Sequence, residues 1–327
     1  MSTLQPAVGI DVAKRTLQIA LLIDGKFKQK SCPNTPEGFV QLLSWLDKHA
    51  GCSVHVVLEA TGRYQDAVAC ALVAAGHTVS VLNPLVVQRY AQCRLTRTKT
   101  DPTDAALLAE FCHKERPEAW QPPAAELREL QELVRHVQSL EESRQAVSNQ
   151  LGSGVVSTYV TNSLNERMAS LTGQNESGWR HIQHWSNEHP GLKFQRKLLV
   201  SIPGIAEKTA AVILAEVQDM TRFGDVRQLV AYAGLCPKER LSGSSLRGKP
   251  QLSKVGNARL RKALFMPALV AMRWNPLLRA HAERLAQRGK HKMAILGALM
   301  RKLLHLAFGV LKNGKPFDPN FATCQPR

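Results

Sequence analysis

The first 122 residues alternate between short apolar runs and helical patterns, and this alternation restricts the fold more than any other feature of the sequence. Three runs typical of β-strands come first, and Asp24-Gly25, a frequent hairpin turn, joins the second to the third. Two further apolar runs each follow a helical segment, as parallel strands require. We therefore predict an α/β domain, in which a three-strand meander is extended by parallel strands and helices cover the faces. The predicted strands are 7–13, 17–23, 26–32, 54–58 and 77–82.

Acidic residues stand at the ends of two of these strands. Asp11 follows the apolar residues 7–10, and Glu59 follows 54–58. If the two strands are neighbours, both carboxylates emerge at the same end of the sheet. Asp101 and Asp104 begin a helix that follows the last strand, and we expect it to pack across that end. Four converging carboxylates repel one another unless cations neutralise them, and oxygen-only ligation suits Mg²⁺.

The stretch Thr98 to Phe111, TKTDPTDAALLAEF, also has a purely local interpretation. Asp101 would be the N-cap of a helix, with Pro102 as its first helical residue. Asp104 would lie in the first turn, where the positive helix end favours a carboxylate. On this stretch alone both interpretations stay open.

Positive charge is concentrated in the C-terminal part of the chain. Residues 196–327 hold 24 Lys and Arg against 7 Asp and Glu, a net charge of +17, whereas residues 1–195 hold 19 of each. Because lysine and arginine release counterions when they bind phosphates, this asymmetry indicates a nucleic-acid partner rather than a merely soluble basic surface.

Cysteine spacing and hydropathy argue against zinc, secretion and a membrane. The seven cysteines form no CxxC pair and are expected to be small buried residues in a reducing compartment. The N-terminus lacks the pattern of a signal peptide. The apolar segment Met293 to Leu311 is interrupted by Arg301, Lys302 and His305, which favours a packed helix over a membrane span. These features predict a protein of the cytoplasm, which is a reducing compartment.

Composition predicts three domains: 1–122, the α/β domain; 123–192, a helical, coiled-coil-like arm; and 193–327, a basic and mainly α-helical domain. In the arm, apolar residues recur at helical or heptad spacing. Residues 148–177 are rich in Ser, Thr, Asn and Gly, which weakens any helix prediction there. The recurring apolar residues are Leu127, Leu130, Leu133, Val134, Val137 and Leu140.

Two segments of the basic domain are candidates for contacts with nucleic acid. Residues 198–217 form two apolar helical runs around Pro203-Gly204-Ile205, the pattern of a helix-hairpin-helix, in which Gly204 and Lys208 would contact a phosphate. An ordinary helical corner is the alternative. The segment 242–245 reads as a Ser-rich loop where a hydroxyl nucleophile could meet a phosphate, or as an ordinary loop. It is flanked by the cations Lys238, Arg240, Arg247, Lys249 and Lys254.

The strand order and the GIDVAK first strand resemble the RNase H-like fold in its RuvC form. Seven motifs in order extend the resemblance over nearly the whole chain, most weakly between 148 and 190: GIDVAKRTL, LEATGRY, VLNP, KTDPTDAALLAEF, SIPGI, AYAGLCP and SGSSLRG. Together they resemble the DEDD-type insertion-sequence transposases, the family that includes Piv-type DNA invertases and bridge-RNA-guided recombinases.

The resemblance implies roles for particular residues. Asp11, Glu59, Asp101 and Asp104 would be the metal-binding tetrad of a RuvC-like domain. Ser242 would be the nucleophile that joins covalently to DNA, although spacing alone does not choose among the three serines Ser242, Ser244 and Ser245. The resemblance also implies a composite active site between protomers, in a tetramer built as a dimer of dimers. The tetramer would carry a bridge RNA that pairs with donor and target DNA.

The implied chemistry is coherent. A serine hydroxyl is a weak nucleophile at neutral pH, and Mg²⁺ beside the scissile phosphate would activate it. The covalent intermediate would retain the energy of the phosphodiester for rejoining. Arg240 and Arg247 are candidates for stabilising charge on the phosphate, or for surface contacts only.

Three other functions remain open on the sequence. A RuvC-like nuclease or junction resolvase would use water as its nucleophile and would need the tetrad but not Ser242. A sugar-kinase or actin-like ATPase also opens with a Gly-Ile-Asp strand, but we find no second glycine-rich phosphate loop on a strand turn. A non-enzymatic nucleic-acid binder would use its carboxylates only as caps and surface charges.

Overall fold

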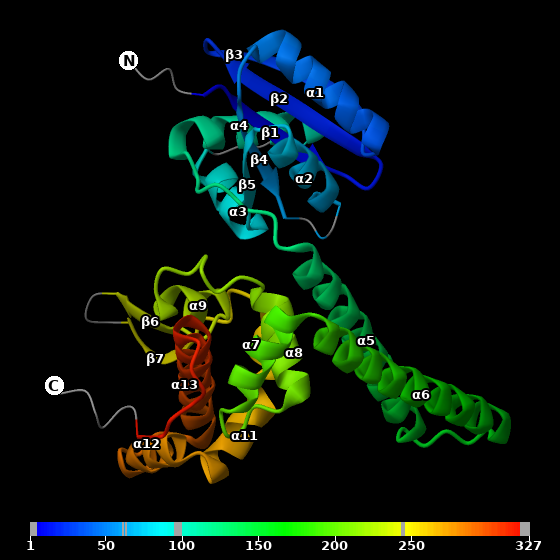
Figure 1. Ribbon diagram of the computed structural model, residues 1–327, viewed down its shortest axis with the longest axis vertical. Coiled ribbons are helices and arrows are strands. Elements are labelled where there is room, and N and C mark those ends of the chain that lie inside the picture. The colour runs from blue at the N-terminus through cyan, green and yellow to red at the C-terminus, as the bar shows by residue number, and fades with distance from the viewer. Residues whose placement is uncertain (1–4, 61, 63, 95–99, 243–245, 321–327) are drawn as a thin grey trace. The chain divides into compact units, whose positions relative to one another are not determined.

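The computed structural model describes residues 5–60, 62, 64–94, 100–242 and 246–320, and for 239–242 and 246–250 it describes the backbone alone. The chain divides into two compact units, residues 1–122 and 123–327. Figure 1 shows the elements of each unit in chain order. A further boundary after residue 192 stays a prediction.

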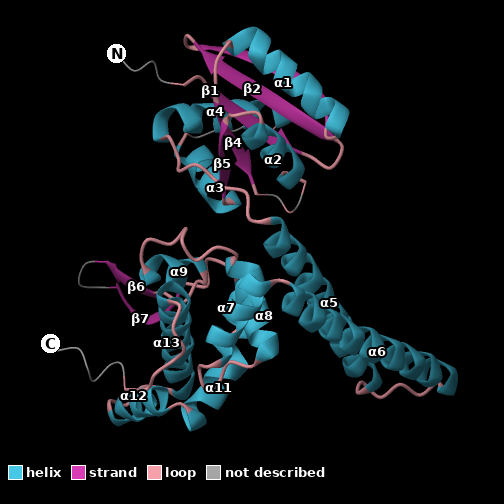
Figure 2. Ribbon diagram, in the orientation of Figure 1, coloured by secondary structure: helices cyan, strands magenta, loops and turns pink. Residues whose placement is uncertain are grey.

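The first unit is built on a five-stranded mixed sheet with the order β3-β2-β1-β4-β5 (Figure 2). The first three strands form an antiparallel meander, and β4 and β5 run parallel to β1. The predicted element order and the meander with its parallel extension are thereby confirmed. The strands are β1 (Ala7–Val12), β2 (Thr16–Ile23), β3 (Lys26–Pro33), β4 (His55–Glu59) and β5 (Thr78–Leu82).

Helices cover both faces of this sheet because the strand residues alternate between two apolar clusters. Val8 and Ile10 of β1 are buried in one cluster with Leu42 and Leu72, which belong to α1 (Pro36–Ala50) and α2 (Asp66–Ala74). The other face packs against α3 (Pro84–Cys93) and α4 (Asp101–Glu115), through a cluster that contains Ala7 of β1 and Leu108 of α4.

The expectation that all cysteines are buried is wrong, since Cys52 and Cys93 are exposed.

The second unit begins with two long helices, α5 (Ala125–Leu151) and α6 (Thr158–Glu188), which pack against each other as an antiparallel pair (Figure 1). The composition of residues 148–177 argued against a helix, but α5 and α6 cover most of that stretch. Contacts with α5 outweigh the low helix propensity: the Asn175 amide donates to the Val137 carbonyl oxygen at 3.2 Å, and Gly178 lies against the Val137 side chain. Ser157 caps the start of α6.

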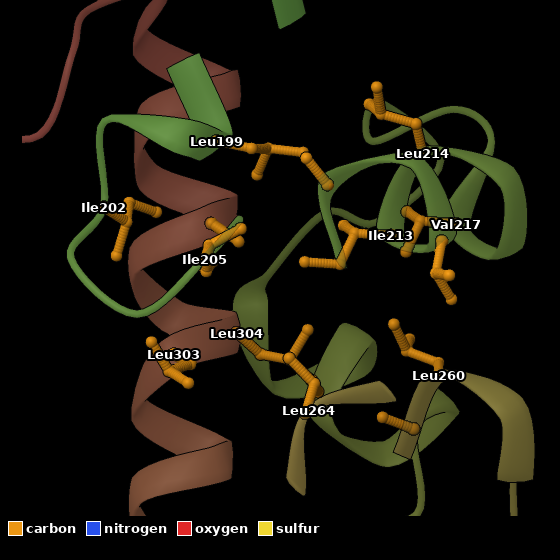
Figure 3. Packing of buried hydrophobic residues seen from close by; sticks show 14 of the residues in the cluster. Leu199, Ile202, Ile205, Ile213, Leu214, Val217, Leu260, Leu264, Leu303 and Leu304 are labelled. Atoms are coloured by element: carbon orange, nitrogen blue, oxygen red, sulfur yellow. The ribbon is translucent and has the colours of Figure 1, made fainter. Parts of the chain in front are cut away.

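The rest of the second unit is mostly helical and carries one two-stranded hairpin. Its core gathers leucine and isoleucine side chains from α7, α8, α10 and α13 and from the turn after α7 (Figure 3). The elements are α7 (Pro190–Val200), α8 (Glu207–Val217), α9 (Val226–Tyr232), β6 (Pro237–Ser242), β7 (Leu246–Leu252), α10 (Ala258–Ala263), α11 (Phe265–Trp274), α12 (Pro276–Gln287) and α13 (Lys292–Asn313).

Helix α13 is long and apolar. Among the helices that the structure describes, it alone has the length and composition to cross a membrane, and half of its most apolar window is buried inside the unit. Leu299, Leu303, Leu304 and Ala307 are fully buried in the core. This packing agrees with the predicted core helix.

Candidate active site

The strand register places Asp11 and Glu59 side by side. In the parallel pair β1 and β4, Ile10 lies opposite Leu58. The residue after each of these is the acidic one, and Glu59 is also the last residue of β4. Both carboxylates therefore belong to the carboxyl ends of neighbouring strands, as the sequence predicts.

Both acidic side chains also project from the same face of the sheet. Successive side chains of a strand point to opposite faces. Asp11 points to the same face as Ala7, and Glu59 to the same face as Val57. Ala7 and Val57 belong to one buried cluster with Leu108 of α4. The side chains of Asp11 and Glu59 are partly exposed. They thus lie at the margin of the face that α4 covers.

The start of α4 is held against β1 by a glycine. A Cβ atom at Gly9 would collide with the backbone of Ala105 and Ala109, so only glycine allows this approach. Asp104 directly precedes Ala105 and is half-buried, whereas Asp101 is exposed one turn earlier. At the same end of α4, the Gln29 amide of β3 donates to the Pro102 carbonyl oxygen at 3.2 Å.

The predicted N-cap of α4 is wrong by one residue. Thr100 is the cap and Asp101 the first helical residue. The Thr100 amide donates to the Thr103 hydroxyl oxygen at 3.0 Å, and the Asp104 amide donates to the Thr100 carbonyl oxygen at 2.9 Å. Threonines therefore satisfy the helix end, and capping does not require the Asp101 carboxylate.

The donor chemistry of the four predicted ligands fits a hard divalent cation, because all four are carboxylates. The geometry is only partly assembled: within the described ranges, no three Asp, Glu, His or Cys side chains are arranged to hold a metal ion. The register brings Asp11 and Glu59 together, and α4 brings Asp104 to the same face. Asp101 lies one helical turn before Asp104 and is exposed.

The predicted serine loop connects two paired strands, and only its first residue, Ser242, is among the described residues. Ser242 is the last residue of β6 and pairs with Leu246 of β7. Lys238, also on β6, is exposed. Ser244 and Ser245 lie outside the described residues. Three predicted nucleic-acid contacts lie on these strands, where the backbone alone is described: Arg240, Arg247 and Lys249.

A buried ionic cluster, which the sequence interpretation missed, lies next to the base of this hairpin. Glu216 of α8 is 1% exposed. Its two carboxylate oxygens accept hydrogen bonds from Arg135 of α5 at 2.9 and 3.0 Å, and the second also accepts one from Asn257 at 2.8 Å. Burial works to raise the pKa of Glu216, but these hydrogen bonds and the charge of Arg135 outweigh it, so the pKa is lowered. The only sequence signal was one acidic residue inside the apolar run of α8.

Gly204 and Lys208 lie at the junction of α7 and α8. Gly204 has a φ of 107°, and a side chain there would meet Ala271 and Pro267 of α11. The Lys208 ammonium lies 5.2 Å from the centre of the Trp179 ring of α6. Lys254, in the turn after β7, is exposed and has a positive φ of 57°. Contacts of all three with nucleic acid stay predictions.

Known proteins resemble both parts of the chain. The DEDD transposase profile of IS110 matches residues 8–160, and the profile of the transposase IS116/IS110/IS902 family matches residues 196–283. The pilin gene-inverting protein of Moraxella lacunata is 33% identical over 318 residues, 95% of this chain and 97% of the relative; that of Moraxella bovis is equally similar. An insertion element IS110 protein of Streptomyces coelicolor is 36% identical over 121 residues, 37% of this chain and 30% of the relative.

The mixed α/β unit with acidic strand ends and these matches define a class, the enzymes that cut and rejoin DNA. Within that class, the chain belongs to the IS110-type transposase family of insertion sequences. DEDD-type transposases typically use divalent metal ions.

Proposed function

We propose that Asp11, Glu59, Asp101 and Asp104 bind Mg²⁺ in an RNase H-like, RuvC-type domain, and that Ser242 attacks the scissile DNA phosphate. The observation that carries the proposal is the place of Asp11 and Glu59 directly after the paired residues Ile10 and Leu58 of two neighbouring strands. The place of Ser242 at the end of β6, in a segment whose sequence contains several lysines and arginines, supports the second half.

The proposed reaction is a phosphoryl transfer that balances without an energy-rich cofactor. A bond forms between Ser242 Oγ and phosphorus, the bond to a deoxyribose oxygen breaks, and the released hydroxyl takes up a proton as the serine loses one. Attack by a different DNA hydroxyl on the serine phosphodiester then rejoins strands and restores Ser242. Mg²⁺ would supply activation of the attacking hydroxyl and neutralisation of phosphate charge. The carboxylates hold that cation, and Arg240 and Arg247 stabilise charge on the phosphate.

The partners of this reaction are donor and target DNA, and the basic C-terminal part is their main contact. Its excess of 17 positive charges supports binding of a polyanion. By family resemblance, we further propose a bridge RNA, a tetramer built as a dimer of dimers, coiled-coil pairing through α5 and α6, and a helix-hairpin-helix at α7 and α8. The proposed contacts are Gly204, Lys208, Lys238, Arg240, Arg247, Lys249 and Lys254. The cellular location would be the bacterial cytoplasm.

The gene-inverting relatives support strand exchange between two DNA sites. The Moraxella proteins are named pilin gene-inverting proteins, and inversion of a gene requires both cutting and rejoining of DNA. We extend that requirement to this chain, because the similarity spans both of its units.

The test is recovery of the protein under denaturing conditions from cells that carry the gene with its native flanking DNA. Covalently attached DNA is measured for the wild type, Ser242→Ala and Asp101→Asn. Ser244→Ala and Ser245→Ala are matched controls for the serine, and Asp24→Asn, in the exposed β2–β3 turn, is the control for loss of a carboxylate.

We expect an adduct in the wild type and the controls and none in Ser242→Ala or Asp101→Asn. Strand breaks without an adduct, lost only in Asp101→Asn, would instead establish a metal-dependent nuclease that uses water. Intact recombination in correctly folded Asp11→Asn, Glu59→Gln and Asp101→Asn would indicate a nucleic-acid-binding protein that does not use these carboxylates for catalysis.

A further inference from the structure

The β6–β7 hairpin leaves the body of the second unit through two short segments, residues 232–236 before β6 and 253–257 after β7, which we call the hairpin root. Three backbone hydrogen bonds join the two segments: the amides of Ser253, Lys254 and Asn257 donate to the carbonyl oxygens of Cys236, Gly234 and Tyr232, at 2.8, 3.1 and 2.6 Å.

The close fit of the root depends on two glycines. Gly256 has a φ of 138°, and a Cβ atom there would collide with the Tyr232 carbonyl oxygen. Gly234 has a φ of 67°, and a Cβ atom there would meet the Val255 carbonyl oxygen at 2.9 Å. The two segments are therefore packed backbone to backbone, and a shift of one moves the other.

Glu216 attaches this root to the helices behind it. Its carboxylate accepts from the Asn257 amide at 2.8 Å, and its backbone carbonyl oxygen accepts from the Tyr232 hydroxyl at 2.9 Å. The Asn257 amide also donates to the Tyr232 hydroxyl oxygen at 3.2 Å. On its other side the carboxylate receives the bidentate guanidinium of Arg135 from α5. One buried side chain thus contacts the root and the arm.

We propose that Glu216 is a positioning residue for Ser242: by holding Asn257 and Arg135 together, it sets the direction in which the β6–β7 hairpin leaves the body. This inference rests on the proposed role of Ser242 as the nucleophile. Asn257 also caps α10 through its side-chain oxygen, which accepts from the Leu260 amide at 2.9 Å. The same side chain therefore fixes the hairpin root and the following helix.

The distance from the hairpin root to Ser242 explains why the direction of the hairpin matters. Strand β6 runs from Pro237 to Ser242, a distance of roughly 17 Å at about 3.3 Å per residue. A change of a few degrees at the root therefore displaces the hydroxyl by about 1 Å, and a misplacement of that size can cost about 100-fold in rate.

The alternative is that Glu216 only stabilises the fold, and a double substitution distinguishes this role from positioning. Replacing a buried ion pair with apolar residues of similar size is often neutral or stabilising. Arg135→Met with Glu216→Met should therefore retain thermal stability, while Asn257 loses its carboxylate acceptor. Asn257→Ser removes the donor to Glu216 but keeps a side-chain oxygen to cap α10. Glu142→Gln is the matched control, because it removes an exposed ion pair between α5 and Lys262 of α10.

The first measurement is amide hydrogen exchange of the full-length protein, which does not depend on the serine chemistry. In Glu216→Gln, Asn257→Ser and the double Met variant, we expect exchange in β6, β7 and residues 253–257 to accelerate at least about tenfold, with α13 unchanged. Glu142→Gln should match the wild type. Unchanged exchange at the hairpin root in all three variants would overturn the proposal.

The second measurement is the single-turnover rate of serine–DNA adduct formation together with the Kd for DNA. We expect the rate to fall about 10- to 100-fold in the three variants while the Kd changes little. A rate restored to the wild-type value in the stable double Met variant would also overturn the proposal, since Glu216 would then act only through stability. If the wild type forms no adduct, or Ser242→Ala retains it, the proposed nucleophile fails instead, and hydrogen exchange still decides the role of Glu216 at the hairpin.

Discussion

Gly9 is the residue on which the approach of α4 to the sheet depends. Gly9→Ala should destabilise the first unit by about 1–3 kcal/mol, because the new methyl group meets backbone atoms of Ala105 and Ala109 that cannot rotate away. Gly173→Ala is the control: its site in α6 has open space, so we expect no loss and a gain of up to about 1 kcal/mol. Urea unfolding measures both, and equal effects would contradict the packing.

Thr103 separates the capping role from the ligand role at the start of α4. Thr103→Val removes the acceptor of the Thr100 amide and should cost about 1 kcal/mol of unfolding free energy. Asp101→Asn should change it by less than about 0.5 kcal/mol, since Asp101 is exposed and is not the cap. A larger loss of unfolding free energy in Asp101→Asn would show that this carboxylate stabilises the helix. The measurement also shows whether that variant is suitable for the adduct assay.

Glu216 predicts a pH dependence of stability. Its folded pKa lies below the usual value of 4.5, so the unfolded chain binds more protons as the pH falls past that value. The stability contributed by this carboxylate is therefore present above pH 4.5 and is lost as the pH falls through the folded pKa. The difference in unfolding free energy between wild type and Glu216→Gln should shrink from pH 7 to acidic pH. A constant difference would contradict the buried ion pair.

Helix α6 shows, at the scale of an element, how tertiary contacts override local preference. A peptide of residues 158–188 should have little helix by far-UV circular dichroism, because its Ser, Thr, Asn and Gly residues favour other conformations. A peptide of residues 125–188, which adds α5, should be markedly more helical per residue. Equal helicity in the two would mean that α6 needs no partner.

The strands of the first unit were predictable because their pairing is local or follows short crossovers, and because residues such as Val8 and Ile10 alternate with residues of the other face. The β6–β7 hairpin was not, since its strands PKERLS and LRGKPQL carry no apolar alternation. The Glu216 cluster was also hidden, because Arg135 and Asn257 lie far from it along the chain. The sequence indicated Asp11 and Glu59 because each follows a run of buried strand residues. The N-cap of α4 was not recognised, because it is Thr100 and not Asp101, the residue after it.

The charge of the whole molecule predicts a strong salt dependence of nucleic-acid binding, carried by its C-terminal part. Lys238→Gln and Lys254→Gln should each reduce the slope of log K against log salt concentration by about 0.9, if each lysine neutralises one phosphate of duplex DNA. Lys26→Gln, on exposed β3, is the matched control. Binding titrations at several salt concentrations measure the slopes. An equal reduction in Lys26→Gln would contradict the assignment of nucleic-acid binding to the C-terminal part.

The pairing of β1 with β4 also limits how such chains can vary in length. Inserting or deleting one residue between Ala7 and Asp11 would turn Asp11 toward the apolar cluster of α1 and α2, and would turn Ile10 toward α4. The turn at Asp24-Gly25 carries no such constraint, because both of its residues are exposed. Length differences among related proteins should therefore collect in the turns of this unit and spare the first strand.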